Sequence, residues 1–182
     1  MEDDSKITLK DLGEIPSLYL EARLTDSPVP LAGTESVYFW SKEPGTGKTH
    51  LAWAFYIDSR LKNEKTKPIF STFGALQLKL RGAMNGGAQT EQEIITEFSN
   101  KKMVILDDLG GLRPGNASDY SLCMIFEILN NRYSWGRQTV VTSNKNLEGI
   151  ESDFDARIAS RLGGMCRVLE LKGGDRRIKR GN

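Results

Sequence analysis

Short runs of apolar residues alternate along this chain with longer stretches in which apolar positions recur every three or four residues. The short runs are rich in β-branched and aromatic residues, which is typical of strands. The run from Met103 to Leu106 has no polar member, as expected of a strand that is buried on both faces of a sheet. We therefore predict five strands, over residues 37–40, 68–72, 103–106, 139–143 and 166–171.

The stretches between those strands predict helices. After residue 49, roughly one helical face carries Leu51, Ala54, Phe55, Asp58 and Leu61, of which only the aspartate is polar. Strands that alternate with helices indicate an α/β fold with a parallel sheet. The other predicted helices span residues 74–84, 90–98, 119–133 and 154–162.

The length of 182 residues fits one well-packed domain rather than two. We expect residues 36–182 to form this domain and residues 1–35 to be an N-terminal lead-in packed on its core. Prolines interrupt the lead-in, and its apolar pattern predicts a short helix within residues 15–24.

The charge of the chain is balanced overall but unevenly distributed. A net charge of +1 gives no general attraction for nucleic acid, whereas the C-terminal part is strongly basic. Such a cluster is either a solvated face or a surface for the phosphates of a nucleotide or a nucleic-acid strand. Its members are Arg157, Arg161, Arg167, Lys172, Arg176, Arg177, Lys179 and Arg180.

The two cysteines, Cys123 and Cys166, form no C-x-x-C motif, so neither a metal site nor a disulfide framework is indicated. The N-terminus is acidic, and no stretch approaches the ~18 apolar residues of a membrane span. We therefore expect a soluble, cytoplasmic protein with no membrane partner.

The segment from Ser41 to Thr49 lies between a predicted strand and a predicted helix, and its ending, Gly-Thr-Gly-Lys-Thr, is typical of a phosphate-binding loop. Glycines let backbone N–H groups turn toward phosphate oxygens, Lys48 reaches the outer phosphates, and the Thr49 hydroxyl ligates Mg²⁺. The flanking strand and helix disfavour the alternative, a glycine-rich turn. We expect nucleotide contacts, with ATP or ADP and Mg²⁺ as cofactors, from Pro44, Gly45, Thr46, Gly47, Lys48, Thr49 and His50.

Two residues near this loop need separate interpretation. Lys42 replaces the first glycine of the motif, and we interpret it as a solvated loop residue rather than a second phosphate ligand. His50 is the only histidine, and we expect it to cap or pack near the loop rather than to act as an acid or base.

Asp107 and Asp108 end the buried strand with two carboxylates, as P-loop ATPases do to hold Mg²⁺ and to orient the attacking water. We assign Asp107 to the metal and Asp108 to the water, against the alternative of two acids that begin a surface loop. Because Asp108 is one methylene shorter than glutamate, hydrolysis is expected to be slow. Asn144 follows the fourth strand, where it is either a turn residue or a hydrogen-bond donor to the γ-phosphate or the same water.

Arg157 and Arg161 lie four residues apart on one predicted helix and therefore project from one face. A guanidinium there can stabilise charge on a transferring phosphate of the same or a neighbouring subunit. The alternative is a solvated helix face on which an arginine pairs with Asp153 or Asp155.

With these residues in place, the chain resembles the ATPase domain of the bacterial replicative helicase loaders, the DnaC/DnaI type, and their relatives the IstB transposition helpers, all of the AAA+ class. The residues that carry the resemblance are Ile15-Pro16-x-x-Tyr19-x-x-Ala22-x-Leu24, Pro44 to Ala52, Leu106-Asp107-Asp108-Leu109-Gly110 and Thr142-Ser143-Asn144. The resemblance implies a P-loop three-layer sandwich around a five-stranded parallel sheet, here with no clear lid domain.

The resemblance also implies roles for single residues. Asn144 takes the sensor 1 role, Arg161 that of an arginine finger acting on a neighbour's ATP, and Arg177 the sensor 2 role, with Arg157 and Arg176 as their fallbacks. Self-association through ATP sites, a replicative helicase as partner and contact with single-stranded DNA follow from the same resemblance.

Four functions remain open from the sequence. The first is an ATP-hydrolysing DNA-replication factor of the helicase-loader type, and its nearest alternative is an IstB-like transposition helper that assembles on duplex DNA. A nucleotide-gated interaction module with little turnover is consistent with Lys42 and Asp108. A small-molecule kinase is disfavoured because no acceptor site or lid is apparent. Family members usually carry a further N-terminal region that grips a partner, whereas here the matching segment begins almost at the start of the sequence. We therefore expect either a short version of such a protein or one whose partner-binding part is absent.

Overall fold

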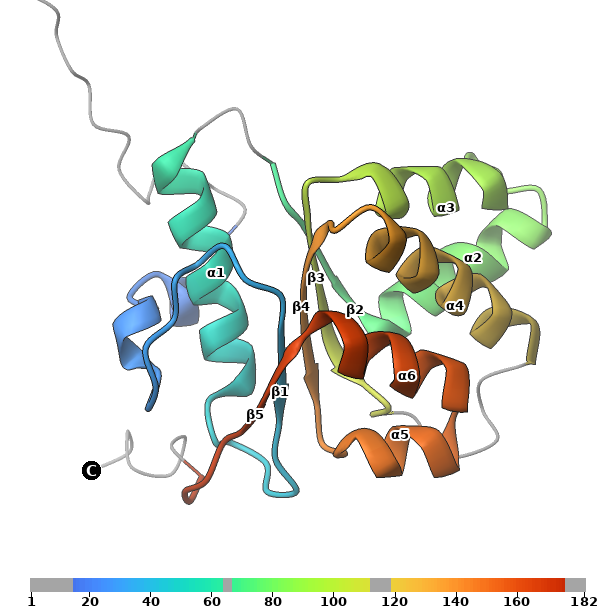
Figure 1. Ribbon diagram of the computed structural model, residues 1–182. Helices are drawn as coiled ribbons and strands as arrows, with labels where there is room; N and C mark the ends of the chain where they lie inside the picture. The colour runs from blue at the N-terminus through green and yellow to red at the C-terminus, as the bar shows by residue number, and fades with distance from the viewer. Residues whose placement is uncertain (1–14, 64–66, 112–118, 176–182) are drawn as a thin grey trace, which may run out of the picture.

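A single parallel sheet forms the centre of the molecule in the computed structural model, which describes residues 15–63, 67–111 and 119–175 (Figure 1). The strand order β2-β3-β4-β1-β5 differs from the sequence order, so helices must connect the strands by crossing over the sheet. The fold class predicted from the sequence is confirmed. The strands are β1 (Val37–Trp40), β2 (Ile69–Thr72), β3 (Met103–Leu109), β4 (Gln138–Ser143) and β5 (Arg167–Glu170).

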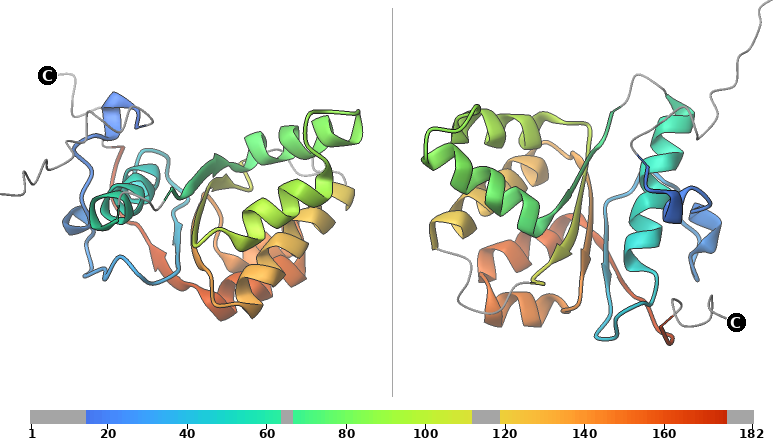
Figure 2. Two further views of the ribbon diagram at one scale, coloured as in Figure 1. Left: turned by 90° about the horizontal axis from the view of Figure 1, so that it is seen from above. Right: turned by 180° about the vertical axis from the view of Figure 1, so that it is seen from behind.

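Helices cover both faces of this sheet and complete three layers (Figure 2). Helix α1 (Lys48–Lys62) lies alone on one face, beside two short 3-10 segments at Ser17–Tyr19 and Leu24–Asp26. The remaining helices lie on the opposite face; they are α2 (Phe73–Met84), α3 (Glu91–Asn100), α4 (Asp119–Ser134), α5 (Leu147–Asp153) and α6 (Ala156–Met165). No helix of the described residues is long and apolar enough to cross a membrane.

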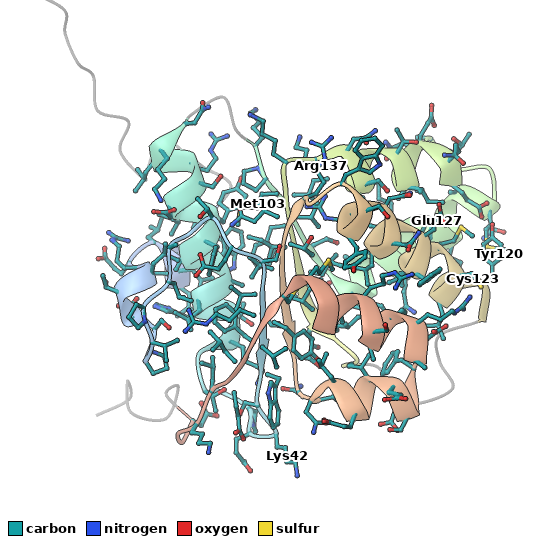
Figure 3. All side chains as sticks on the ribbon, viewed as in Figure 1. Lys42, Met103, Tyr120, Cys123, Glu127 and Arg137 are labelled. Atoms are coloured by element: carbon teal, nitrogen blue, oxygen red, sulfur yellow. The ribbon has the colours of Figure 1, made fainter. Side chains whose placement is uncertain are left out.

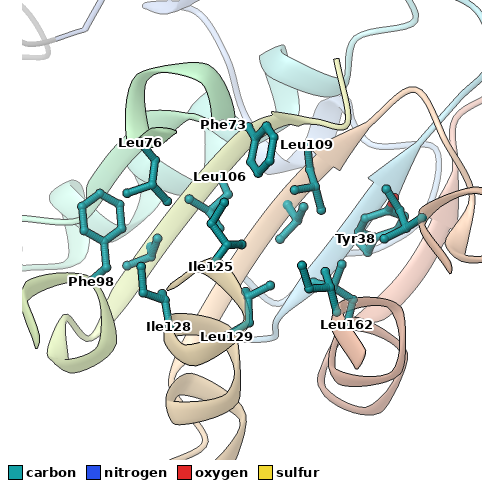
Figure 4. Close-up of a cluster of buried hydrophobic side chains, with 14 of the residues drawn as sticks. Tyr38, Phe73, Leu76, Phe98, Leu106, Leu109, Ile125, Ile128, Leu129 and Leu162 are labelled. Atoms are coloured by element: carbon teal, nitrogen blue, oxygen red, sulfur yellow. The ribbon is translucent and has the colours of Figure 1, made fainter. Parts of the chain in front are cut away.

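Alternating side chains of each strand fill two separate cores. In β1, Val37 and Phe39 pack with α1, whereas Tyr38 faces the opposite helices. In β3, Ile105 belongs to the α1 side and Leu106 to the other, as predicted for a strand buried on both faces. Figure 4 shows the larger core, to which α2, α3, α4 and α6 contribute; its labelled members include Phe73, Phe98, Ile125, Leu129 and Leu162.

Two local predictions were wrong, and one helix was not predicted. The short helix predicted for residues 15–24 is absent: Pro16 precedes the first 3-10 segment, and the extended backbone of Arg23 separates it from the second. Leu61 is 52% exposed because it lies near the end of α1, beyond the buried face. Helix α5 was not predicted, since its seven residues bury only Ile150 and show no periodic stripe.

The described part of the lead-in packs against α1. Ile15 and Ala22 are buried in the α1-side core. The Tyr19 ring stacks on Trp53 of α1, with ring centroids 5.9 Å apart. These contacts place residues 15–26 next to the helix that follows the phosphate-binding loop.

Candidate functional site

The candidate site lies at the edge of the sheet where the parallel strands end. The loop from Ser41 to Gly47 leaves β1 at this edge, and Figure 3 shows Lys42 there. The Ser41 backbone N–H donates to the Ser143 carbonyl at 3.2 Å, so the loop is fixed to the end of β4. The chain therefore brings the predicted loop to the sheet edge where functional groups of parallel sheets gather.

Two glycines give the loop its shape. Gly45 and Gly47 have φ angles of 70° and 98°, in the left-handed region that other residues rarely adopt. Gly47 caps α1, whose first residue is Lys48, so the positive end of the helix dipole faces the loop. The Thr46 Oγ1 is buried and has no hydrogen-bond partner among the described residues. Backbone N–H groups, a helix N-terminus and a spare hydroxyl together suit an anionic phosphate chain.

Lys48 and Lys42 differ in position as the sequence predicts. The Lys48 ammonium is folded over its own loop, where it donates to the carbonyls of Ser41 at 3.3 Å and Glu43 at 3.1 Å. Lys42 is exposed at the rim, as is Pro44. Of the two lysines, Lys48 is therefore the one whose ammonium lies over the loop.

Thr49 and Asp107 meet although they come from different elements. The Thr49 hydroxyl donates to the two carboxylate oxygens of Asp107 at 3.0 and 3.2 Å. Burial raises the Asp107 pKa, even though hydrogen bonds from Thr142 and Thr49 act to lower it. A hydroxyl and one carboxylate are hard oxygen ligands, and Mg²⁺ typically takes such a pair together with substrate phosphates. The residues present therefore fit a Mg²⁺–nucleotide complex.

Thr142, on the neighbouring strand β4, contacts both acidic residues. Its hydroxyl donates to Asp107 at 2.6 Å and accepts the backbone N–H of Asp108 at 2.9 Å. Asp108 is exposed and has a φ of 59°, the only positive φ of a non-glycine residue in the described ranges. Asp108 therefore combines a strained backbone with an exposed side chain, whereas the side chain of Asp107 is buried.

Asn144 directly follows β4, as predicted. Its amide donates to Asp108 Oδ1 at 3.4 Å, and both side chains are exposed. The structure therefore brings together the loop, Asp107, Asp108 and Asn144. An exposed amide beside an exposed carboxylate is an arrangement that can hold a water molecule or a phosphate oxygen.

His50 packs against the lead-in. Its Nε2–H donates to Asp26 Oδ2 at 2.7 Å. Partial burial acts to raise the Asp26 pKa, but hydrogen bonds from His50 and from the Arg23 backbone outweigh it and lower the pKa. The ring is thus engaged by a residue of the N-terminal segment, in agreement with the expected packing role.

Arg157 and Arg161 lie on one face of α6, which packs on α4. Arg157 pairs with Asp155 at 2.6 Å and lies 4.7 Å from the centroid of the Phe126 ring. Arg161 donates to Asn130 Oδ1 at 2.8 Å and lies 5.2 Å from the centroid of the Tyr133 ring. These contacts are with α4 and with the N-cap of α6, so the structure does not join either arginine to the loop of its own chain.

Arg177, like Arg176, falls outside the described residues. The last described residue, Asp175, reaches the phosphate-binding loop from the segment after β5. A Cβ added to Gly45 would lie 1.9 Å from Asp175 Oδ1, so the carboxylate packs directly on the glycine.

Sequence reasoning missed four contributors: Asp26, Asn130, Thr142 and Asp175. Thr142 was noted only as a member of the Thr-Ser-Asn motif. Thr142 lies two residues before Asn144, and this spacing was the available signal. The other three contacts join segments distant in sequence, and no local pattern marks them.

The sheet order, the loop and the acidic end of β3 define an ATP-binding domain of the AAA+ class. The chain belongs to the family of IstB-like ATP binding proteins, whose family model matches residues 39–182. The resemblance predicted from the sequence is thereby confirmed.

Individual relatives are distant. The chain is 24% identical over 130 residues to the replicative helicase loader DnaC of Escherichia coli (strain K12), a match that covers 71% of this chain and 51% of that protein. The crystal structure of the DnaC helicase loader has a TM-score of 0.69 at 22% identity and covers 86% of this chain and all of its own. That of DnaI has a TM-score of 0.67 at 20% identity, with coverage of 87% and 95%. The chain spans about half the length of the curated relatives it matches.

Proposed function

We propose that this protein binds Mg²⁺–ATP at the edge formed by the phosphate-binding loop, β3 and β4, and hydrolyses it within an assembly of several copies. The observation that supports the proposal is the Thr49–Asp107 contact, because a hydroxyl at the start of α1 and a carboxylate at the end of β3, two groups suited to Mg²⁺, meet beside the loop. Family membership supports ATP as the nucleotide.

Each residue of the site has one task in this proposal. Lys48 and the loop backbone bind the phosphates, while Thr49 and Asp107 hold Mg²⁺, which neutralises phosphate charge when bound. Asp108 accepts the proton of the attacking water and Asn144 orients that water or the γ-phosphate. Arg177 is assigned by resemblance to contact the nucleotide from the C-terminal segment.

The arginine that acts on a neighbouring subunit is Arg161 rather than Arg157. The Arg157 guanidinium is paired with the Asp155 carboxylate, which neutralises its charge. In the described part of the chain, Arg161 contacts the amide of Asn130 and the rings of Phe126 and Tyr133, none of which is anionic. Its charge therefore remains available to a phosphate of the adjacent copy.

The biological role proposed is that of a DNA-replication factor of the helicase-loader type, with a replicative helicase as partner. The names of the DnaC and DnaI relatives support this choice, while the IstB family name supports the alternative of a transposition helper. Comparison of binding to a replicative helicase with binding to duplex DNA distinguishes the two roles.

The test combines nucleotide binding with turnover in mixed assemblies. Lys48→Ala should abolish ATP binding, whereas Lys42→Ala, a lysine at the rim of the same loop, should leave it unchanged. Arg161→Ala should bind ATP but not hydrolyse it, and Arg157→Ala should retain turnover. Mixing Arg161→Ala with Lys48→Ala should restore part of the turnover. In mixed assemblies, an Arg161→Ala copy supplies the intact ATP site and a neighbouring Lys48→Ala copy supplies the arginine.

One observation favours a second candidate, a nucleotide-gated interaction module. Asp108 is short, and its carboxylate is turned to solvent, so its reach to the attacking water is limited. Tight ATP binding without turnover, in the presence of single-stranded DNA and of a helicase, would select the module and overturn hydrolysis. Unchanged ATP affinity in Lys48→Ala would overturn both candidates.

A further inference from the structure

The end of β3 contains a β-bulge at its two acidic residues. Between Leu106 and Leu109, two residues of β3 lie opposite one residue of β4, so that Asp107 and Asp108 together face Thr142. A bulge bends its strand and redirects a side chain, and bulges are common beside active sites. Within this bulge, Asp108 has a φ of 59°, a strained conformation for a residue other than glycine. Such a conformation persists only where surrounding contacts hold it.

Two hydroxyl groups of β4 hold the backbone on both sides of Asp108. Before the side chain, Thr142 Oγ1 accepts the Asp108 N–H at 2.9 Å. After it, Ser143 Oγ donates to the Leu109 carbonyl at 2.6 Å. Thr142 and Ser143 are fully buried, so water has no access to replace either hydrogen bond. The conformation of Asp108 is therefore set from the neighbouring strand.

The Ser143 hydroxyl also fixes the position of Asn144. Its Oγ accepts the backbone N–H of Lys145 at 3.0 Å and so closes a turn that has Asn144 at its centre. The Lys145 carbonyl accepts the Tyr38 hydroxyl at 2.7 Å, which ties the same turn to β1. The Asn144 amide donates to Asp108 Oδ1 at 3.4 Å. One buried hydroxyl thus supports both partners of the exposed Asn144–Asp108 contact.

The connection of Ser143 to the phosphate-binding loop is made by its backbone. The Ser143 carbonyl accepts the N–H of Ser41 at 3.2 Å, and a change of side chain leaves that carbonyl in place. The hydrogen bonds of the hydroxyl go instead to the ends of β3 and β4. Removal of the hydroxyl should therefore act on Asp108 and Asn144 without removing a group that binds the nucleotide.

We propose that Ser143 is a positioning residue for ATP hydrolysis, which keeps Asp108 and Asn144 beside each other. The inference rests on the proposed function, in which Asp108 accepts the proton of the attacking water and Asn144 orients that water or the γ-phosphate. Ser143 touches neither the nucleotide nor the water, since its side chain is buried beneath both residues. A displacement of about 1 Å in a catalytic group lowers the rate about 100-fold, so a small shift of the bulge has a large effect.

The experiment measures kcat for ATP and the Kd for Mg²⁺–ATP in the wild type and in Ser143→Ala. We expect kcat to fall about 10- to 100-fold and the Kd to stay unchanged. Ser99→Ala is the matched control, because it removes another buried serine hydroxyl, which accepts the Asn131 amide at 3.3 Å on α3; both constants should be unchanged. Circular dichroism checks the fold. Ser143→Cys, with a similar volume and a weak donor, should also lower kcat and serves if the alanine variant does not fold.

A double-mutant cycle with Asn144→Ala separates positioning from a general loss of structure. Ser143→Ala should lower kcat much less in the Asn144→Ala background than in the wild type, because the contact that Ser143 supports is already lost. Equal fold-changes in the two backgrounds would overturn the inference, as would a weaker Kd that accounts for the whole loss of turnover.

The same measurements distinguish failure of this inference from failure of the proposed function. If the wild type hydrolyses ATP and Ser143→Ala has the same kcat, the inference is overturned and the proposed function stands. If the wild type binds ATP without turnover, the role of Ser143 in hydrolysis is overturned and the nucleotide-gated module is selected. If the wild type binds no ATP, the proposed function itself is overturned, together with the inference that rests on it.

Discussion

Thr49 and Asp107, which are 58 residues apart in sequence, are joined by a hydrogen bond of 3.0 Å between hydroxyl and carboxylate. The contact connects the first turn of α1 to the end of β3. Thr142 donates to the same carboxylate from β4, so three elements converge on one buried acid. Any substitution in this triad acts both on the fold and on the proposed Mg²⁺ site.

Thr142→Val should destabilise the protein and weaken the site. The isosteric change removes the donor to Asp107 and leaves the Asp108 backbone N–H without its acceptor. A buried polar group left unpaired costs about 1–3 kcal/mol, and the free energy of unfolding in urea measures this loss. Thr142→Ser retains the hydroxyl and is the control. Equal stability of the two variants would contradict the assigned hydrogen bonds.

Much of the fold and part of the site follow from sequence patterns. The uninterrupted apolar run of β3 predicts a buried strand, and the acids after it must then lie at the sheet edge. The loop is predicted because a strand, two glycines and Lys48 stand in a fixed order. These signals are local, and the physical constraint behind each is local too.

The remainder of the site depends on contacts across the fold. Thr142 reaches Asp107 only because β3 and β4 are neighbours in the sheet. The Asp26–His50 pair and the contact of Asn130 with Arg161 each join different elements. Such pairs leave no periodic trace in one sequence, so strand order and helix packing must be known first.

Asp107→Asn should change the pH dependence of stability. Burial holds the Asp107 pKa above its ordinary value of 3.8, so in the window just above pH 3.8 the folded state retains a proton that the unfolded state has lost. The contribution of this residue to stability therefore falls as pH rises through the window. In the variant, urea unfolding should show a flatter profile there and equal or greater stability at neutral pH.

The same Asp107→Asn variant should lose Mg²⁺-dependent nucleotide affinity. An amide is a weaker ligand for Mg²⁺ than a carboxylate, and a loss of at least about tenfold, ~1.4 kcal/mol, is expected. Titration with ATP in the presence of Mg²⁺ and of EDTA separates the metal contribution. Asp153→Asn, which alters an acid paired with Lys145 at the surface, is the control. Unchanged Mg²⁺ dependence would remove Asp107 from the metal site.

Asp175→Asn should strengthen ATP binding. The carboxylate packs on Gly45, and a negative charge at that position opposes the phosphates of the nucleotide. Its neutralisation should tighten binding about threefold to tenfold at low salt, with the gain shrinking as salt screens the charge. Glu170→Gln, an acid of the adjacent strand β5, is the matched control. Equal or weaker affinity in Asp175→Asn would show that the carboxylate does not oppose the nucleotide.

Arg132 should prove the most sensitive polar residue of the core. Its side chain is fully buried, and burial, reinforced by the Arg137 charge, lowers its pKa to about 10, so it stays protonated at neutral pH. The guanidinium donates to the carbonyls of Phe98 at 2.7 Å and Lys101 at 2.8 Å, and also to that of Gln138. It thereby holds the end of α3 and the start of β4 together.

Arg132→Met keeps the volume but leaves those carbonyls without a donor. We expect a loss of about 3–5 kcal/mol in the free energy of unfolding, measured in urea. Arg132→Lys should recover only part of the lost stability, because one ammonium group cannot reach all the carbonyls to which the planar guanidinium donates. Arg81→Met, at an exposed position of α2, should change stability by no more than about 0.5 kcal/mol. An Arg132→Met variant as stable as the wild type would show that apolar packing of the methionine offsets the loss of all these hydrogen bonds. The buried guanidinium would then contribute to the specificity of the fold rather than to its stability.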